Sequence, residues 1–231
     1  MQLTAKQREQ AEVLYLILGG MFITSLVTSN LIFQKFFTWT PFGLYTFELS
    51  VGIIAYPVTF LITDVISEVY GRKRANRVVL AGVFASMFSL GIIVVSAKAP
   101  ATDWSPLSNA EFSKTFGFTF IAVGASMAAY LLAQLLDVQL FHFWKRLTNG
   151  RHLWLRNNMS TFGSQLVDTL VVVSLLCSFG VIPWALMPGL VLNGFLFKVL
   201  FAMFDTPVAY LLVYGLRRHF GLKGVGVELE F

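Results

Sequence analysis

Long apolar stretches separated by short polar segments dominate the 231-residue chain. A transmembrane helix needs about 20 mostly apolar residues, because the hydrocarbon core of a bilayer is about 30 Å thick. Six stretches meet this requirement. The pattern therefore predicts an all-α integral membrane protein with six transmembrane helices, at Ala11–Phe33, Val51–Tyr70, Arg77–Ala97, Gly117–Phe143, Thr161–Val181 and Pro188–Leu216.

The segments between these helices have the composition of loops. Some are rich in basic residues, and others contain proline, glycine and interfacial aromatic residues. No linker or low-complexity stretch divides the chain, so residues 1–231 are predicted to form a single transmembrane domain. The main predicted loops are Gln34–Ser50, the tight turn Gly71–Asn76, Lys98–Phe116 and Trp144–Ser160.

Lysine and arginine residues are distributed unequally between the two ends of these helices. Loops rich in these residues stay on the cytoplasmic side of a membrane. One side has Lys35, Lys98 and Lys114, whereas the other has thirteen basic residues. Both termini are therefore predicted to be cytoplasmic, with Met1–Glu12 as a short tail before a retained first helix. The thirteen are Lys6, Arg8, Arg72, Lys73, Arg74, Arg77, Lys145, Arg146, Arg151, Arg156, Arg217, Arg218 and Lys223.

The composition narrows the class of protein further. With 56% hydrophobic residues, 13% charged residues and a mean hydropathy of +0.72, the chain is not an ordinary soluble domain. The net charge of +5 could suit nucleic acid, but the basic residues form no helix face, so no such partner is predicted. Cys177 is alone in its helix, and all three histidines lie at or beyond cytoplasmic helix ends. We therefore expect no metal, cofactor or cysteine–histidine nucleophile within the membrane.

Several ionisable residues interrupt the apolar stretches. A charge inside hydrocarbon costs roughly 2.5 kcal/mol or more, so it is tolerated where it is paired or lines a polar cavity. A solute pathway through the helix bundle is the simplest reason for such residues. They are Asp64, Glu68, Asp137, Asp168, Lys198 and Asp205, of which Asp137 lies close enough to a helix end to be interfacial.

Two carboxylates lie four residues apart in the second helix. This spacing places Asp64 and Glu68 on one helix face, which Thr63 and Ser67 border. Such a face could bind a substrate that carries N–H groups. The alternative for Glu68 is an ion pair with Arg72, also four residues away, at the inner interface. That alternative is weaker for Asp64, which lies one turn deeper.

A polar stripe opens the fifth helix. Thr161, Ser164, Gln165 and Asp168 follow the spacing of one helix face, and Ser160 precedes them. A stripe of this length is not expected to face lipid. The alternative is a helix–helix interface held by hydrogen bonds. Asp168 favours the functional interpretation, because such an interface does not require a carboxylate.

The sixth helix contains a lysine in mid-membrane. Lys198 needs a partner from another helix, and Asp64 and Asp168 are the candidate counter-ions. A purely structural buried ion pair is the alternative. Asn193, five residues before Lys198, repeats the spacing that Asn30 has to Lys35, so both asparagines are candidate substrate-binding residues.

Three motifs together resemble one transporter family. They are TDVISEVYGRKRA at 63–75, RNNMSTFGSQLVDT at 156–169 and NGFLFKVLFAMFDTPVAY at 193–210. In these motifs, in length and in helix layout, the chain resembles the queuosine precursor transporter family, also called the vitamin uptake transporter family. The resemblance implies uptake of 7-cyano-7-deazaguanine and 7-aminomethyl-7-deazaguanine, precursors of the tRNA base queuosine, across a bacterial inner membrane. It also implies a fold similar to the six-helix substrate-binding subunits of energy-coupling-factor transporters.

The leading interpretation is a carrier, working alone or as a homodimer in the bilayer, and not an enzyme. The alternatives are the substrate-binding subunit of an ATP-driven vitamin importer and a carrier for another small purine-like solute. Those importer subunits usually have small residues on their first helix, whereas this chain has Ala125, Ala129 and Ala133 on its fourth. The predicted substrate-binding residues are Asn30, Asp64, Glu68, Ser160, Thr161, Gln165, Asp168, Asn193 and Lys198.

Overall fold

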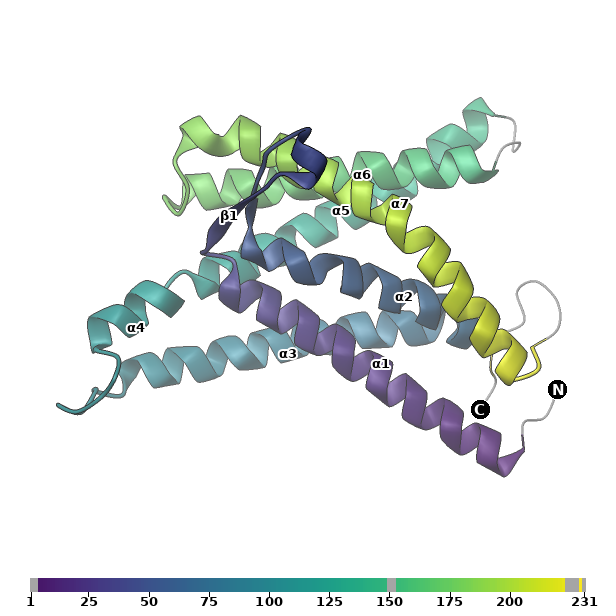
Figure 1. Cartoon of the computed structure of the whole chain (residues 1–231), viewed down its shortest axis with the longest axis horizontal. Coiled ribbons are helices and arrows are strands. Elements are labelled where there is room, and N and C mark those ends of the chain that lie inside the picture. The colour runs from purple at the N-terminus through teal and green to yellow at the C-terminus, as the bar shows by residue number, and fades with distance from the viewer. Residues whose placement is uncertain (1–3, 149–152, 223–228, 230–231) are drawn as a thin grey trace. The chain divides into compact units, whose positions relative to one another are not determined.

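Helices make up most of the fold in the computed structural model (Figure 1). The structure describes residues 4–148, 153–222 and 229, apart from the side chains of some residues in these ranges, Ser160, Asp137 and Arg72 among them. The main elements are α1 (Ala5–Ile32), β1 (Phe36–Trp39), β2 (Phe47–Ser50), α2 (Tyr56–Tyr70), α3 (Arg72–Lys98), α4 (Asn109–Phe116), α5 (Thr119–Leu147), α6 (Leu153–Ser178) and α7 (Met187–His219). Short 3₁₀ helices lie at Pro41–Gly43, Val51–Ala55 and Trp184–Leu186.

Five helical segments in the described part of the chain are long and apolar enough to cross a membrane. They are Ala5–Ile32, Val51–Tyr70, Lys73–Lys98, Thr161–Ser178 and Trp184–His219. The protein is therefore a multi-pass membrane protein built largely of helices, as the hydropathy pattern predicts.

Most of the helices are longer than the apolar pattern predicted, but α2 begins at Tyr56, after a 3₁₀ helix, and is shorter than the predicted Val51–Tyr70. Only Gly71, with a φ of 87°, separates α2 from α3, so the predicted turn Gly71–Asn76 is mostly helical. Glycine tolerates this backbone conformation because it has no Cβ. α1 already begins at Ala5 and α6 at Leu153, so the predicted tail and the predicted loop Trp144–Ser160 are both shorter than expected.

One predicted loop contains a helix. α4 lies within Lys98–Phe116, and Ser108 caps its first turn. The Ser108 hydroxyl accepts from the Glu111 backbone N–H, and the Glu111 carboxylate accepts from the Ser108 N–H at 2.8 Å. This reciprocal capping box satisfies donors that a helix start otherwise leaves unpaired. The Ser-x-x-Glu spacing was a signal for this helix that the prediction of a loop overlooked.

A β-hairpin occupies the other loop that was expected to be irregular. β1 and β2 pair antiparallel, with Thr38 opposite Glu48 and Trp39 opposite Phe47. The side chains of successive strand residues alternate between two faces, and here Phe47 and Leu49 are buried while Glu48 is exposed. The fold is consistent with the all-α expectation apart from this hairpin, which was not predicted because short strands are missed when apolar length is the criterion.

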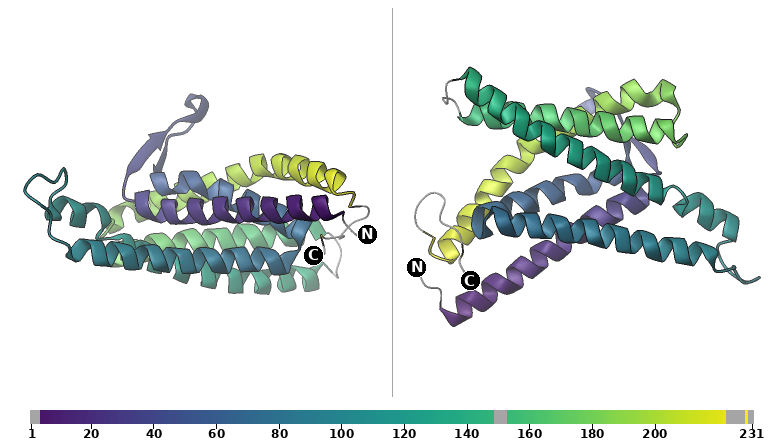
Figure 2. Two further views of the ribbon diagram at one scale, coloured as in Figure 1. Left: turned by 90° about the horizontal axis from the view of Figure 1, so that it is seen from below. Right: turned by 180° about the vertical axis from the view of Figure 1, so that it is seen from behind.

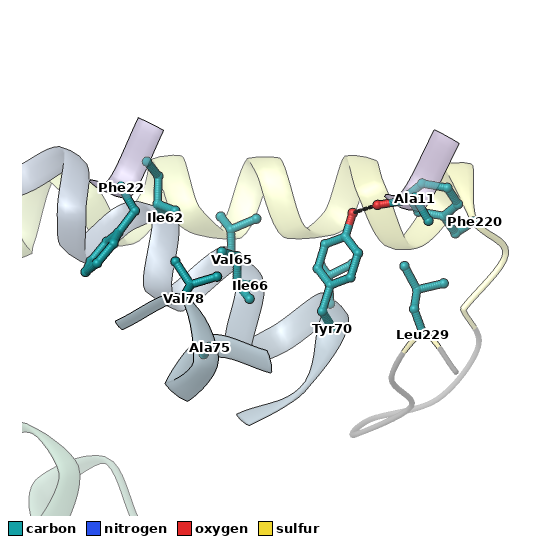
Figure 3. Packing of buried hydrophobic residues seen from close by; sticks show 11 residues of the cluster. Ala11, Phe22, Ile62, Val65, Ile66, Tyr70, Ala75, Val78, Phe220 and Leu229 are labelled. Carbon is teal, nitrogen blue, oxygen red and sulfur yellow. Dashed lines mark hydrogen bonds between the residues drawn. The ribbon is translucent and has the colours of Figure 1, made fainter. Parts of the chain in front are cut away.

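The chain forms two compact units. The first comprises Met1–Phe33, Val51–Val95 and Leu200–Phe231. Its core contains Ile66 (Figure 3). Both Ile66 and Val69 are fully buried in this core. The Tyr70 hydroxyl donates to the backbone oxygen of Ala11 at 2.9 Å and so joins α2 to α1. A buried phenol needs such a partner, because an unpaired polar group in an apolar core is costly.

The second unit comprises Gln34–Ser50 and Ser96–Val199. Within it, α5 and α6 lie side by side along much of their length (Figure 2). Three alanines of α5, at 125, 129 and 133, are buried. Small residues at this spacing allow close packing of helices. The alanine repeat is therefore buried by packing within the chain.

Candidate functional site

A buried ion pair joins α6 to α7 in the second unit. The Lys198 Nζ lies 2.5 Å from the Asp168 Oδ2, and the two side chains are only 8% and 7% exposed. A charge-assisted hydrogen bond of this kind is short and strong. The prediction that Asp168 is a counter-ion for Lys198 is thus confirmed. Each charge removes the cost of burying the other, so neither side chain can change without consequence.

Close contact of α6 with α7 holds the pair together. A Cβ added at Gly194 would lie 3.0 Å from the Thr169 Cγ2. Glycine at position 194 therefore lets the two helices approach closely. Gly194 lies four residues before Lys198, and Thr169 directly follows Asp168, so the approach is beside the ion pair. The short connection around Trp184–Leu186 joins these two helices.

The polar residues of α6 differ in whether their side chains are hydrogen-bonded within the helix. The hydroxyls of Ser164 and Thr169 donate to backbone oxygens of their own helix, at Thr161 and Gln165. Membrane hydroxyls commonly bond this way, so these contacts do not require a partner helix. The Gln165 Oε1 is different. It is buried and has no hydrogen-bond partner among the residues that the structure describes.

An unpaired buried acceptor is costly, so it is a place where a donor from a ligand would bind favourably. Gln165 lies three residues before Asp168, on the same helix face. A carbonyl acceptor and a carboxylate are therefore adjacent on α6. The Lys198 ammonium adds a donor from α7. The predicted residue Ser160 lies one turn from Ser164 in α6, but its side chain is outside the described part of the structure.

Asn193 connects the ion-pair helix to the β-hairpin. The Tyr45 hydroxyl donates to the Asn193 Oδ1 at 2.7 Å, and the Asn193 Nδ2 donates to the Glu48 backbone oxygen at 3.4 Å. The edge of Trp39 packs against Phe197, with ring centroids 5.9 Å apart. Asn193 and Phe197 are four residues apart, so the hairpin contacts one face of α7 just before Lys198. Sequence reasoning missed Tyr45, which looked like an ordinary interfacial tyrosine.

The remaining predicted residues belong to the first unit. Asn30 is 9% exposed, and its Nδ2 has no hydrogen-bond partner in the described part of the chain. Asp64 and Glu68 share α2 as predicted, and both are exposed. The backbone oxygen of Glu68 accepts from Arg217 at 3.4 Å. The predicted alternative pair with Arg72 cannot be described, because the Arg72 side chain lies outside the described structure.

The hydroxyls around these residues are used for structure. The Thr63 hydroxyl donates to the backbone of its own helix, at Thr59 and Phe60. The Ser29 hydroxyl, one residue before Asn30, donates to the Gly52 backbone oxygen at 2.7 Å. A Cβ at Gly52 would lie 2.7 Å from the Ser29 backbone oxygen, so glycine permits this approach. Asn30, Asp64 and Glu68 are the predicted binding residues that belong to this unit.

The sequence comparisons agree with this arrangement of polar groups inside apolar helices. The family described as "Putative vitamin uptake transporter" matches residues 50–212, which is most of the chain. The chain belongs to the vitamin uptake transporter family. The protein is accordingly a membrane transporter for a small molecule, and the Asp168–Lys198 pair lies inside the region that defines the family.

The relatives with which the chain shares sequence similarity are also named as transporters. The chain is 28% identical over 168 residues to the "Probable queuosine precursor transporter" of Bacillus subtilis, with 72% of each chain covered. It is 28% identical over 216 residues to the "Queuosine precursor transporter" of Escherichia coli, with 91% of this chain and 90% of that one covered. A Haemophilus influenzae relative is 29% identical over 57% of this chain and 53% of its own length. No solved structure gives a significant match.

Proposed function

We propose that the protein imports the queuosine precursors 7-cyano-7-deazaguanine and 7-aminomethyl-7-deazaguanine across a bacterial inner membrane. Membership of the vitamin uptake transporter family supports import of a small molecule. Two relatives are named as transporters of queuosine precursors, and the chain covers 72% and 90% of their lengths. These names support queuosine precursors as the substrates.

The observation that carries the proposal is the buried Asp168–Lys198 pair, with the unpaired Gln165 oxygen beside it. A deazaguanine has adjacent N–H donors on its guanine-like edge, which a carboxylate can accept in a bidentate manner. Its carbonyl oxygen needs a donor, which Lys198 or Asn193 can supply. Substrate donors would then compete with Lys198 for Asp168, so binding would be coupled to rearrangement of the pair.

The other predicted residues form two separate groups, one in each unit. Thr161 and Ser160 extend the polar face of α6 toward its beginning. In the first unit, the Asn30 amide would donate to the substrate carbonyl oxygen. The Asp64 and Glu68 carboxylates would accept from its N–H groups. Their part in transport is tested by substitution, as described below for Asp64.

We further propose six transmembrane helices in a single domain, with both termini in the cytoplasm. In this topology α5 crosses the membrane in addition to the five helical segments named above. The length of α5, 29 residues, and the asymmetry of the basic residues support this topology. Cysteines introduced at Lys73 and Asp103, with Cys177 replaced, should react with an impermeant reagent from opposite sides of the membrane. Labelling of both from outside intact cells would refute the topology.

A carrier that works alone or as a homodimer is favoured over a subunit of an ATP-driven importer. The buried alanines of α5 support this choice, because they are already packed inside the chain and are not free to dock a partner. If the chain were such a subunit, it would purify together with an ATPase module and would not transport without it.

The test is uptake of labelled deazaguanines into cells that lack their own synthesis pathway. Cells expressing the protein should accumulate both precursors, and cells expressing Asp168→Asn at equal abundance should accumulate neither. Accumulation of adenine or guanine in place of the deazaguanines would assign a different purine-like substrate. Normal transport by Asp168→Asn would refute the assignment of the binding site.

A further inference from the structure

The second unit contains a cavity that the proposed binding site does not use. Its volume is about 630 Å³, within the range of roughly 300–1,000 Å³ that is common for small-molecule sites. One wall is the β-hairpin together with Gln34, and the other is formed by the α6–α7 connection and the first turns of α7. The lining residues are Gln34, Phe36, Phe37, Thr38, Glu48, Val181, Ile182, Pro183, Leu186 and Leu190.

The chemistry of this lining is uneven. Most of it is apolar, with the rings of Phe36 and Phe37 on the hairpin wall. Glu48 is the charged residue among those that line the cavity, and it lies opposite Thr38 in the strand register. Both are exposed, and together with Phe36 they share one face of the hairpin, whereas Phe37 lies on the other face. Lys35 lies next to Gln34 in sequence but does not line the cavity.

Glu48 also lies beside the connection to the ion-pair helix. Its backbone oxygen accepts from the Asn193 side chain, which in turn holds the Tyr45 hydroxyl. The exposed carboxylate itself has no hydrogen-bond or ion-pair partner in the described part of the structure. One face of the hairpin wall thus combines the aromatic ring of Phe36 with an available anion, and this wall is bonded to α7 five residues before Lys198.

We propose that this cavity is a second binding site, which takes a flat, nitrogen-containing aromatic ring bearing a protonated amine, with Glu48 binding the amine. The ring would pack against Phe36, which shares the hairpin face of Thr38 and Glu48 in the strand register, since aromatic pairs gain from offset or edge-to-face contact. The ammonium would form a charge-assisted hydrogen bond with the Glu48 carboxylate. The Thr38 hydroxyl and the Gln34 Oε1 are further polar groups among the lining residues for the ring nitrogens, whereas the Gln34 Nε2 already donates to the Thr115 backbone oxygen.

The inference rests on the proposed function and sharpens it. Of the two proposed substrates, only the aminomethyl form carries an amine that is protonated at neutral pH, whereas the cyano group is uncharged. The cavity would therefore raise the affinity for the aminomethyl form alone, before the ring reaches the Asp168–Lys198 pair. Glu48 would be a specificity-determining residue and not a general requirement for transport.

The test is the concentration dependence of uptake of each labelled precursor by wild type and Glu48→Gln. We expect Glu48→Gln to raise the half-saturating concentration of the aminomethyl form about tenfold or more, because a hydrogen bond to a charged group is lost. Uptake of the cyano form should stay unchanged, which also shows that the variant folds. Asp103→Asn is the matched control, because it removes an exposed carboxylate of the same unit that does not line the cavity.

Two results would overturn the inference while leaving the proposed function intact. One is equal loss of both precursors in Glu48→Gln, which would mean a structural role for Glu48. The other is no change for either precursor. If wild type imports neither precursor, the proposed function fails, and equilibrium binding of the two labelled compounds to purified protein then decides. Amine-selective binding that Glu48→Gln weakens would support the cavity, and its absence in wild type would refute it.

Discussion

The carboxylates of α2 and the carboxylate of α6 differ in their surroundings, although the same sequence rule selected them. Asp64 and Glu68 share a face of α2 and are both exposed. Asp168 is 5% exposed and forms an ion pair with Lys198 from another helix. A spacing of four residues thus identifies a shared face, but it does not determine whether a partner is present.

Because Asp168 is buried in an ion pair and Asp64 is exposed, substitutions at the two sites should differ in their effects. Substitution of the pair should affect folding, whereas substitution of Asp64 should affect transport. A buried pair contributes through both charges, and loss of either one leaves the other unpaired in a medium of low dielectric constant. An exposed carboxylate has no such structural obligation, so its substitution should affect what the carboxylate binds. Variants of the two regions should therefore fall into two classes, and the following predictions test that division.

The largest effect is expected from breaking the buried pair. Lys198→Met should lower the free energy of unfolding by about 3–5 kcal/mol, because the Asp168 carboxylate is then buried without its partner. The double variant Lys198→Met/Asp168→Leu should recover most of this loss, because both charges are gone. Thermal unfolding of the purified proteins in detergent measures both changes. A Lys198→Met protein that melts and transports like the parent would mean that the lysine has no role in either property.

The next largest effect is expected from α2, and on transport alone. Asp64→Asn should abolish or sharply reduce uptake, because it removes an acceptor for substrate N–H groups. Its unfolding free energy should change by less than about 0.5 kcal/mol, as is usual for an exposed side chain. Asp103→Asn serves as the control for loss of an exposed carboxylate. Destabilisation of Asp64→Asn as large as that of Lys198→Met would erase the distinction between the two regions.

A smaller effect is expected where the hairpin meets α7. Tyr45→Phe removes the donor to Asn193, at a cost of about 1 kcal/mol to the docking of the hairpin. A hairpin with two four-residue strands is marginal without such contacts, so amide protons of β1 and β2 should exchange faster. Tyr214→Phe, at an exposed tyrosine of α7, is the matched control. Unchanged exchange in Tyr45→Phe would show that Trp39 and Phe197 suffice to hold the hairpin.

The smallest effect is expected at the start of α4. The hydrogen bonds from Ser108 lower the pKa of the Glu111 carboxyl group below its ordinary value. Their stabilising effect is therefore present above the ordinary glutamate pKa and is lost as the pH falls through the lower folded value. Ser108→Ala should raise the pKa of Glu111 and fray α4 without changing uptake. Titration of Glu111 by NMR measures this shift, and an unchanged pKa would refute the capping role.

Much of the fold follows from the sequence because the length of an apolar stretch is a strong local signal for a membrane helix. Each of the six predicted ranges overlaps one long helix of the structure. These helices are α1, α2, α3, α5, α6 and α7. Their ends were misjudged, since polar residues such as Arg72 and Arg156 continue a helix as readily as they form a loop. The hairpin was missed because its strands are only four residues long and alternate faces, which hydropathy averaging conceals.

The candidate site was predictable in its residue types and less so in its contacts. Lys198 required a counter-ion, and the sequence reduced the choice to Asp64 and Asp168 without deciding between them. The close approach of α6 to α7 at Gly194 decides it, and such an approach depends on tertiary packing. The bond from Tyr45 to Asn193 joins residues 148 positions apart, so no local pattern could reveal it.

The most direct test of the account is substrate binding by the charge-free double variant. Lys198→Met/Asp168→Leu should fold, so loss of binding in this protein cannot be attributed to unfolding. We predict that purified wild type binds labelled 7-aminomethyl-7-deazaguanine and 7-cyano-7-deazaguanine, and that the double variant binds neither in equilibrium dialysis. Binding of both compounds by the folded double variant with wild-type affinity would contradict the claim that the buried pair is the substrate-binding element.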